Sequence, residues 1–440
     1  MTRKTKSAAA LAGKRRGTRL EIPCHSFDLD CGARLFVSPR PGAPVTAVRI
    51  HLRGGRSSDP EGRDGLGLLV GALADQGTKS YDEEAISRLL MPAGGAVSGD
   101  ANGLSGTVAG EGWKLLSEIM ASMLTEPRYP AGPVARQKER VIGRLMAEAQ
   151  DPRVQGAQLL RTLVYGDHWL ARPERGTAES VAAITPAQLR AHQRRTWVAS
   201  RAMISVCGAV EPEQVSRHWN RMLRGWKSGR PHVQTPLRFP APGKRVAAFT
   251  AERAQVHVHL GHLGIRRSDP DYPALVLLDH ILGTGPGFTD RISRRLRDEL
   301  GLAYSVSAAI HSSAGLAPGL FRAYIGTSRE HVGTAVAAFL EEMHRIRREP
   351  VAAEELELAR DYLLGSYPLG FERASRRASF LITREVHGFG ESYLEDLIAS
   401  FEAVTIADVQ RAAGQHLWPE RCCLAAAGPV KQAELRRALG

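Results

Sequence analysis

The feature that most constrains the fold is an internal duplication. Residues 184–210 and 404–430 align without a gap at an offset of 220 residues, and each segment reads as a threonine N-cap, a helix and an apolar strand ending in glycine. A shorter echo pairs residues 56–60 with residues 267–270, each ahead of a leucine-rich helix. Similar order at similar spacing predicts one unit of about 210 residues that occurs twice.

A segment rich in proline and glycine separates the two copies. It spans residues 225–243, shows little hydrophobic periodicity, and holds Gly229, Pro231, Pro236, Pro240 and Pro242. Such a composition is typical of an extended linker. We therefore predict an N-terminal domain over residues 20–224, a linker over 225–244 and a C-terminal domain over 245–440, which suits a chain of 440 residues.

Strand and helix patterns follow the same order within each copy. In the first copy we expect strands at 45–52 and 96–109, helices at 64–76, 113–124 and 133–150, and a capping box at Ser80 and Glu83. In the second copy we expect helices near 271–282 and 289–300 and strands near 303–311 and 320–326. Hairpins between long helices predict an α+β fold of two homologous domains, each an antiparallel β-sheet with helices packed on one face.

Positive charge is concentrated at the N-terminus. Residues 1–19 carry seven positive charges and no acid, so of the net +13 only about +6 belongs to the remainder. We predict a solvated basic tail, because its one apolar stretch is too short for a secretory signal; an arginine-rich transit peptide has a similar composition. With 6% aromatic residues and no interleaving of basic and aromatic side chains, nucleic-acid binding is not expected.

Hydropathy and cysteine content favour an aqueous, reducing setting. No run of eighteen or more uncharged apolar residues occurs, which argues against a membrane span. The five cysteines are odd in number and form no CxxC pair, so neither a disulfide framework nor a structural zinc site follows. A cytoplasmic location is the simplest expectation.

The residues around the first predicted helix form a recognisable motif. The stretch Gly55-Arg-Ser-Ser-Asp-Pro-Glu-Gly62 is followed by Gly65-Leu66 and by Gly77-Thr78. In this motif, and in overall order from about residue 34 to residue 430, the chain resembles the insulinase-like M16 peptidases, in their branch of half-size bacterial and mitochondrial-processing subunits. The resemblance implies a LuxS/MPP-like metallohydrolase fold.

Active members of that family carry His-x-x-Glu-His on this helix, whereas the window here reads Leu68-Leu-Val-Gly71-Ala72. Catalytic zinc needs three protein ligands with lone pairs and a nearby base for its bound water, and Leu68, Gly71 and Ala72 supply neither. The family's third ligand would fall at Glu148 or at the position of Arg144. Without the histidines, we expect Glu148 to be a helix-surface acid, and we predict no metal in this chain.

The pattern His257-x-His259-x-x-His262 is a further candidate metal site. Alternate residues of a strand share a face, so His257 and His259 could form a pair of ligands. No carboxylate or cysteine stands close by in sequence, and the resemblance puts an ordinary strand and turn here. We therefore prefer the strand interpretation.

The C-terminal copy keeps residues that the resemblance assigns to substrate. The stretch from Arg294 to Ser305 looks like the family motif in which an arginine and a tyrosine seven positions apart act on substrate, here Arg297 and Tyr304. The resemblance implies that Tyr304 donates to the oxyanion and Arg297 to a substrate carbonyl, at a zinc site held in the other half of a chamber. Spacing alone favours a solvated arginine and a core tyrosine, but the surrounding Arg-x-x-x-Gly-Leu-Ala-Tyr-Ser-Val context reverses that preference.

A glycine-rich turn precedes the Arg/Tyr motif. Gly283-Thr-Gly285-Pro-Gly287 lacks the Lys-Ser/Thr of a P-loop and does not fit GxGxxG, so nucleotide binding is not expected. The preferred interpretation is a plain helix-to-helix turn. The resemblance offers a second one, because some noncatalytic processing subunits lengthen this turn into a substrate-contacting loop.

Loss of the metal residues beside retention of the Arg/Tyr pair predicts a subunit that works with another. The leading hypothesis is a noncatalytic subunit of a heterodimeric M16-type zinc metallopeptidase. It would help to enclose a peptide and lend Arg297 and Tyr304 to a His-x-x-Glu-His partner that holds the zinc. The alternative is a structural or peptide-binding scaffold without catalytic contribution, and the sequence leaves a homodimer open. Nucleic-acid binding through residues 1–19 ranks last, and a peptidase active alone is rejected.

Overall fold

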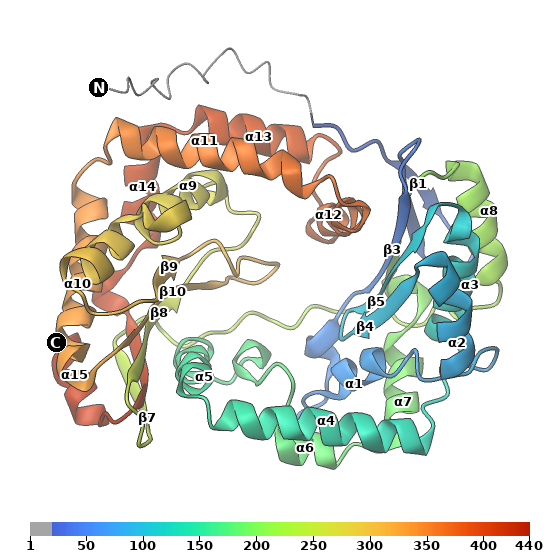
Figure 1. Ribbon diagram of the computed structural model, residues 1–440, viewed down its shortest axis with the longest axis horizontal. Helices are drawn as coiled ribbons and strands as arrows, with labels where there is room; N and C mark the ends of the chain where they lie inside the picture. The colour runs from blue at the N-terminus through green and yellow to red at the C-terminus, as the bar shows by residue number, and fades with distance from the viewer. Residues whose placement is uncertain (1–19) are drawn as a thin grey trace, which may run out of the picture.

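Two β-sheets, each backed by helices, make up the computed structural model, which describes residues 20–440 (Figure 1). The predicted basic tail at residues 1–19 lies outside the described residues. The first sheet consists of β1 (His25–Asp28), β2 (Arg34–Pro39), β3 (Val45–Leu52), β4 (Ala96–Asp100), β5 (Gly103–Ala109) and β6 (Ala202–Gly208). The second sheet consists of β7 (Arg245–Thr250), β8 (Val256–Leu263), β9 (Val306–Ala309), β10 (Leu320–Thr327) and β11 (Cys423–Gly428).

The helices are distributed over both halves of the chain. The first half contains α1 (Leu66–Ala72), α2 (Glu83–Leu90), α3 (Trp113–Thr125), α4 (Ala131–Ala149), α5 (Pro152–Tyr165), α6 (Ala178–Ala182), α7 (Pro186–Thr196) and α8 (Pro212–Met222). The second contains α9 (Tyr272–Leu282), α10 (Val332–Arg348), α11 (Ala353–Gly370), α12 (Ala374–His387), α13 (Tyr393–Ala403), α14 (Ile406–His416), α15 (Gln432–Leu439) and a π-helix at Ser293–Glu299. Within the described chain, none of these helices combines the length and apolarity that a membrane crossing requires.

The α+β class with two sheets is confirmed, and the strand directions add a detail that the sequence did not predict. The strand orders are β1-β2-β6-β3-β5-β4 and β7-β11-β8-β10-β9. Most neighbours are antiparallel, but β6 runs parallel to β2 and β11 runs parallel to β7. Each sheet is therefore mixed, because the last strand of each half returns after several helices and inserts beside an earlier strand.

The duplicated segments form the same structure twice. Thr185 caps α7 and Thr405 caps α14, and each threonine belongs to a capping box with the side chain three residues on. The strands that follow, β6 and β11, lie inside their sheets and are buried along their whole length. No helix or strand of the described chain lies between the end of α8 and the start of β7, the segment in which we predict the linker.

One helix of each half packs on the sheet of the other half. Helix α5 covers the inner face of the second sheet over β7, β11 and β8, and α12 covers the inner face of the first sheet over β2, β6 and β3. An offset of 220 residues carries α5 to residues 372–385, almost onto α12, so the repeated unit exchanges the same helix in both directions. Helices thus pack on both faces of each sheet, whereas the sequence predicted them on one.

The exchanged helices are held by apolar packing and by backbone-directed hydrogen bonds. Leu381 and Ile382 of α12 pack on Phe36 and Met203 of the first sheet, and the hydroxyl of Ser205 donates to the Ala378 carbonyl at 2.8 Å. On the other side, Leu160 and Val164 of α5 pack on Cys423 and Ala425 of the second sheet. Burial of such side chains contributes roughly 1.5–3 kcal/mol each, so the exchange ties the halves together.

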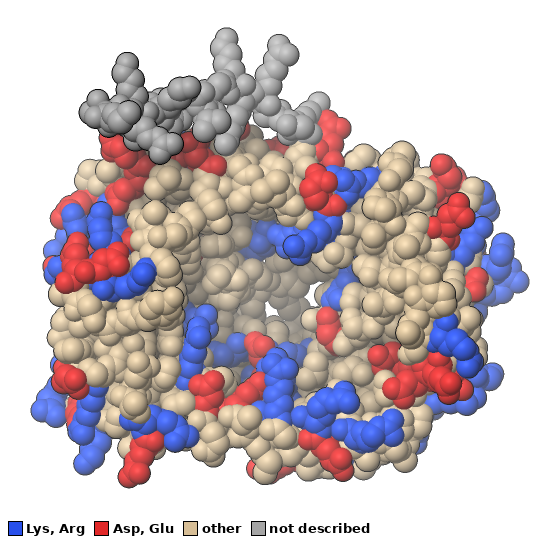
Figure 2. All heavy atoms as spheres, viewed as in Figure 1, with Lys and Arg blue, Asp and Glu red and all other residues tan. Residues whose placement is uncertain are grey.

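A hollow lies between the inner faces of the two sheets, and we call it the chamber. Figure 2 shows it at the centre of the face in view, with basic side chains on its walls. A cavity of about 480 Å³ within the molecule is lined by both halves, including His51 and Trp169 from the first and Leu316 and His387 from the second. The fold therefore surrounds a space that two copies of one unit share.

One helix start differs from the sequence-based prediction. The predicted capping box at Ser80 and Glu83 is wrong, because Asp82 is the N-cap of α2 and its carboxylate accepts from the Ala85 N–H at 2.7 Å. Ser80 instead donates to Glu126 at 2.5 Å. A carboxylate accepts the N–H at a helix N-terminus more strongly than a hydroxyl does, which explains the shift.

Candidate functional site

Helix α1, the position of the family's zinc motif, is short and set by backbone constraints. It begins after Gly65, whose φ of 93° suits glycine, and Leu66 and Leu69 are buried in the core. The buried carboxylate of Asp59 accepts from the N–H groups of Gly65 and Gly67 at 3.2 and 2.8 Å. Burial raises the pKa of Asp59 to about 6 although these two N–H groups oppose the shift.

The zinc-motif positions lack metal ligands, and one of them also lacks space for a larger side chain. Leu68 and Ala72 are half-buried on α1 and carry no metal-binding atom. Gly71 faces the edge strand β4, where an added Cβ would lie 2.7 Å from the backbone nitrogen of Asp100 and closer still to its carbonyl. Zinc does not fit here, because positions 68 and 72 supply no ligand, and a glutamate base at position 71 would have no space between the helix and the strand.

Glu148, the expected remnant of the third ligand, is engaged elsewhere. It lies near the C-terminal end of α4, where its carboxylate accepts from Arg144 at 2.9 Å and from Arg175 at 3.3 Å. Both guanidinium groups contact the same oxygen, Oε1. The geometry agrees with the interpretation of Glu148 as a helix-surface acid.

The three histidines of β8 do not converge on one point. His257 and His259 lie on the inner face, as predicted from strand alternation, and His257 Nδ1 lies 3.0 Å from the Tyr324 hydroxyl. His262 is directed into the opposite side, where its ring stacks on Phe321 and its Nε2 accepts from the Trp418 N–H at 3.1 Å. The strand interpretation of this pattern is supported by these positions.

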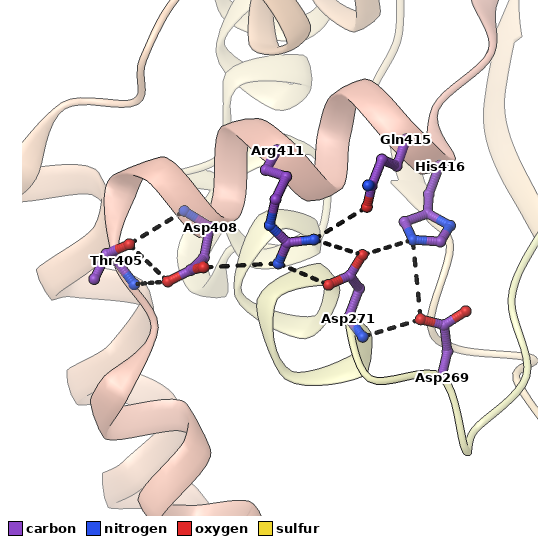
Figure 3. Close-up of polar contacts among 7 residues, drawn as sticks. All are labelled: Asp269, Asp271, Thr405, Asp408, Arg411, Gln415 and His416. Atoms are coloured by element: carbon purple, nitrogen blue, oxygen red, sulfur yellow. Dashed lines mark hydrogen bonds and ion pairs between the residues drawn. The ribbon is translucent and has the colours of Figure 1, made fainter.

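A different trio, Asp269, Asp271 and His416, brings potential metal-ligating atoms within 4.8 Å of one another, the one such group among the described residues. Figure 3 shows that a fourth side chain, Arg411, contacts the Asp271 carboxylate from the side away from Asp269. The Arg411 guanidinium pairs with Asp271 at 2.7 Å, and His416 Nε2 lies 2.9 Å from the same carboxylate. Arg411 and His416 lower the pKa of Asp271, so this cluster is a charged clamp between α9 and α14.

Arg297 and Tyr304 lie side by side in the structure. Arg297 belongs to the π-helix at Ser293–Glu299, and Tyr304 follows Gly301, whose φ is 61°. The Arg297 guanidinium lies 5.7 Å from the centroid of the Tyr304 ring. Tyr304 is 83% exposed, which contradicts a core aromatic. Spacing of seven residues across a π-helix and a turn thus yields a surface pair.

The glycine-rich turn contacts Arg297 of this pair through Phe288. Gly283 packs against β9, where an added Cβ would lie 2.5 Å from the backbone nitrogen of Ala308. Gly287 has a φ of 67°, and Phe288 also adopts a positive φ, of 65°. The turn thereby holds the Phe288 ring under Arg297, with the guanidinium carbon 3.9 Å from the ring centroid. The predicted helix-to-helix turn therefore also has a positioning contact, which the sequence alone did not indicate.

Fold and site together define a class: a duplicated chain with two helix-backed sheets, in which Leu68, Gly71 and Ala72 carry no metal-binding side chain. A family model described as "Peptidase M16 inactive domain" matches residues 183–363. Over these residues the chain is similar to the M16 peptidase family, and its own sequence lacks a His-x-x-Glu-His motif.

Relatives with and without a peptidase name match most of this chain in sequence. The chain is 27% identical to an "Uncharacterized zinc protease" of Mycobacterium tuberculosis over 327 residues, 73% of each chain. It is 20% identical to "Non-peptidase homolog YmxG" of Helicobacter pylori over 371 residues, 83% of this chain and 85% of the relative. The crystal structure of a "peptidase M16 inactive domain" from Pseudomonas fluorescens superposes with a TM-score of 0.86 at 23% identity, covering 93% of this chain and 99% of the other.

Proposed function

We propose that the chain is a noncatalytic subunit of a heterodimeric M16-type zinc metallopeptidase. The supporting observation is an asymmetry between the two halves. In the first half, Gly71 packs on Asp100 so closely that no side chain fits. In the second half, Arg297 and Tyr304 lie together and Tyr304 is exposed. One half has lost its metal site while the other keeps the groups that act on substrate.

In this proposal the two side chains act on a peptide whose scissile bond lies at the partner's zinc site. The zinc belongs to a partner with His-x-x-Glu-His, and this chain holds none. The Tyr304 hydroxyl donates to the oxygen on which negative charge develops, and the Arg297 guanidinium donates to a neighbouring peptide carbonyl. Stacking on Phe288 keeps the guanidinium in place, which lowers the cost of orienting it during the reaction.

Removing one hydroxyl tests the proposal. Tyr304→Phe is expected to lower the turnover of the assembled heterodimer on the order of 100-fold, with little change in KM, because one oxyanion donor is lost in the transition state. Steady-state cleavage of a fluorogenic peptide by the assembly measures both constants.

The control is Tyr362→Phe, which removes the hydroxyl of another exposed tyrosine, on α11, and is expected to leave turnover unchanged. Equal turnover of Tyr304→Phe and wild type would contradict the catalytic role. It would favour the alternative, a structural or peptide-binding scaffold, provided that the assembly stays intact on gel filtration.

A further inference from the structure

A second cavity, of about 690 Å³, lies between α5 and the inner face of the second sheet, and we call it the α5 cavity. Its walls come from α4, α5, residues 173–179 and the strands β8 to β10. The sheet residues that line it are His259, Ser307, Arg322 and Tyr324. Their immediate neighbours along the strands, such as Val258, Ala308 and Phe321, face the core on the other side. The cavity therefore opens toward the chamber.

Two arginines at this cavity have no carboxylate partner. The Arg322 guanidinium makes no hydrogen bond or ion pair with a described residue. The Arg153 guanidinium lies over the Tyr324 ring, 4.6 Å from its centroid. Burial, together with the nearby charges of Arg153 and Arg161, lowers the pKa of Arg322. Both arginines are nonetheless exposed, and positive charges that lie close together are stabilised when an anion joins them.

The acids around the cavity do not neutralise these two guanidinium groups. Glu174 is paired with Arg161 at 3.0 Å, and Glu148 is paired with Arg144 and Arg175. Glu179, also on the wall, is fully exposed and has no ion pair with a described residue. Asp151 caps α5, where its carboxylate accepts from the N–H of Arg153 at 2.8 Å. The charge at Arg322 and Arg153 is thus left for a ligand.

A buried histidine on the cavity wall lacks hydrogen-bond partners. His259 is 2% exposed, and neither ring nitrogen makes a hydrogen bond of normal geometry. Burial and the charge of Arg322 lower the pKa of His259 to about 3, although the backbone of Arg153 opposes part of the shift. The ring is therefore neutral and carries one N–H to donate. Buried polar groups are almost always paired, so this orphan indicates a missing acceptor.

Apolar side chains at the cavity indicate that the ligand is more than a small ion. Met146 of α4 is 62% exposed and Val154 of α5 is 36% exposed, and both line the cavity with Leu145. A ligand that satisfies this wall combines a carboxylate with apolar groups, as an extended peptide segment does. Taking the chamber ligand to be a peptide rests on the proposed function.

We propose that the α5 cavity binds a carboxylate of the enclosed peptide, with Arg322 and Arg153 as charged partners and His259 as a hydrogen-bond donor. Either a C-terminal carboxylate or an Asp or Glu side chain supplies this chemistry. The structural counterpart beside α12 differs, because Arg49 on the inner face of the first sheet is paired with Asp100 at 2.9 Å. Of these two cavities, the α5 cavity is the one lined by guanidinium groups without a carboxylate partner among the described residues.

Binding of labelled peptides to the full chain, without a partner subunit, tests this site. A short Ala/Leu peptide is made in four forms, with Glu or Gln inside it and with a free or an amidated C-terminus. At least one carboxylate form is expected to bind about 10-fold or more tightly than the form without a carboxylate. Arg322→Gln is expected to remove that preference, and Arg153→Gln to weaken it.

The matched control is Arg49→Gln, a chamber arginine that already has a partner, and it is expected to leave the preference unchanged. Near-UV circular dichroism checks that each variant folds. Tighter binding of the peptide with a free C-terminus, or of the peptide with Glu, identifies which carboxylate the cavity binds. The proposal is overturned if the neutral peptide binds equally well, or if folded Arg322→Gln and Arg153→Gln both keep the wild-type preference. Because no partner is needed, a failed Tyr304→Phe test leaves this outcome untouched.

Discussion

At the scale of single residues, Gly71 separates this chain from a peptidase that has merely lost its ligands. Its Cα–H side lies directly against the backbone of Asp100, and Gly99 of the same strand is equally crowded against the Gly71 carbonyl. Two glycines facing each other let α1 and β4 approach at backbone distance. The close approach of the helix and the strand therefore leaves no space for a glutamate side chain at position 71.

Restoring the motif tests this crowding. The triple variant Leu68→His, Gly71→Glu, Ala72→His is expected to bind no zinc and to lose about 2 kcal/mol or more of unfolding free energy, because overpacking forces the helix off the strand. Urea unfolding and metal analysis after dialysis measure the two effects.

The control for that experiment is the double variant Leu68→His, Ala72→His. It changes only the two half-buried positions and keeps Gly71. It is expected to unfold close to wild type. A triple variant that kept wild-type stability and bound one zinc per chain would show that the site was never closed.

The structural roles of some residues could be predicted from the sequence, and those of others could not. The threonine caps at Thr185 and Thr405 were predicted, because capping depends on a few neighbouring residues. The crowding at Gly71 was not, because it depends on a strand about thirty residues away in sequence. Arg322 was missed as well, although its alternation with Phe321 and Ala323 on β10 could have placed it on the inner face.

At the scale of elements, the exchange of α5 and α12 explains how the halves are joined. Each is a helix with an apolar stripe, and such a stripe indicates burial without indicating which sheet is covered. The sequence therefore predicted helices on one face of each sheet and could not assign these two. The clamp of Asp271, Arg411 and His416 is of the same kind, since it joins α9 to α14 across about 140 residues.

Separating the halves tests the importance of the exchange. Residues 20–224 and 245–440 expressed apart are each expected to lack a cooperative unfolding transition, because one inner sheet face loses its helix and stays exposed. Thermal unfolding followed by circular dichroism measures this, and mixing the two pieces is expected to restore the transition.

The comparison is the full chain with a protease site at the exposed Val233 in the linker. After cleavage there, the two fragments are expected to stay associated and to unfold as one unit. Two independently stable halves would contradict the account of the exchanged helices and would make the predicted boundary a true domain boundary in energetic terms.

At the scale of the whole molecule, the two halves enclose a chamber but divide its chemistry unequally. The closed α1 face lies in the first half, the Arg297 and Tyr304 pair lies in the second, and the α5 cavity is lined by both halves. The resemblance to the M16 family was noticed from the motif around residues 55–78, whereas the family model matches residues 183–363. The unequal division became visible only once distant segments were placed together.

The central claim is that this chain has no zinc centre of its own and contributes to catalysis only when it is assembled with a partner subunit. Its most direct test measures peptide cleavage and zinc content for the purified chain alone and after mixing with a His-x-x-Glu-His M16 subunit. We expect no zinc and no cleavage from the chain alone, and chelator-sensitive cleavage from the mixture with zinc only in the partner. Chelator-sensitive cleavage by the chain alone would contradict the account.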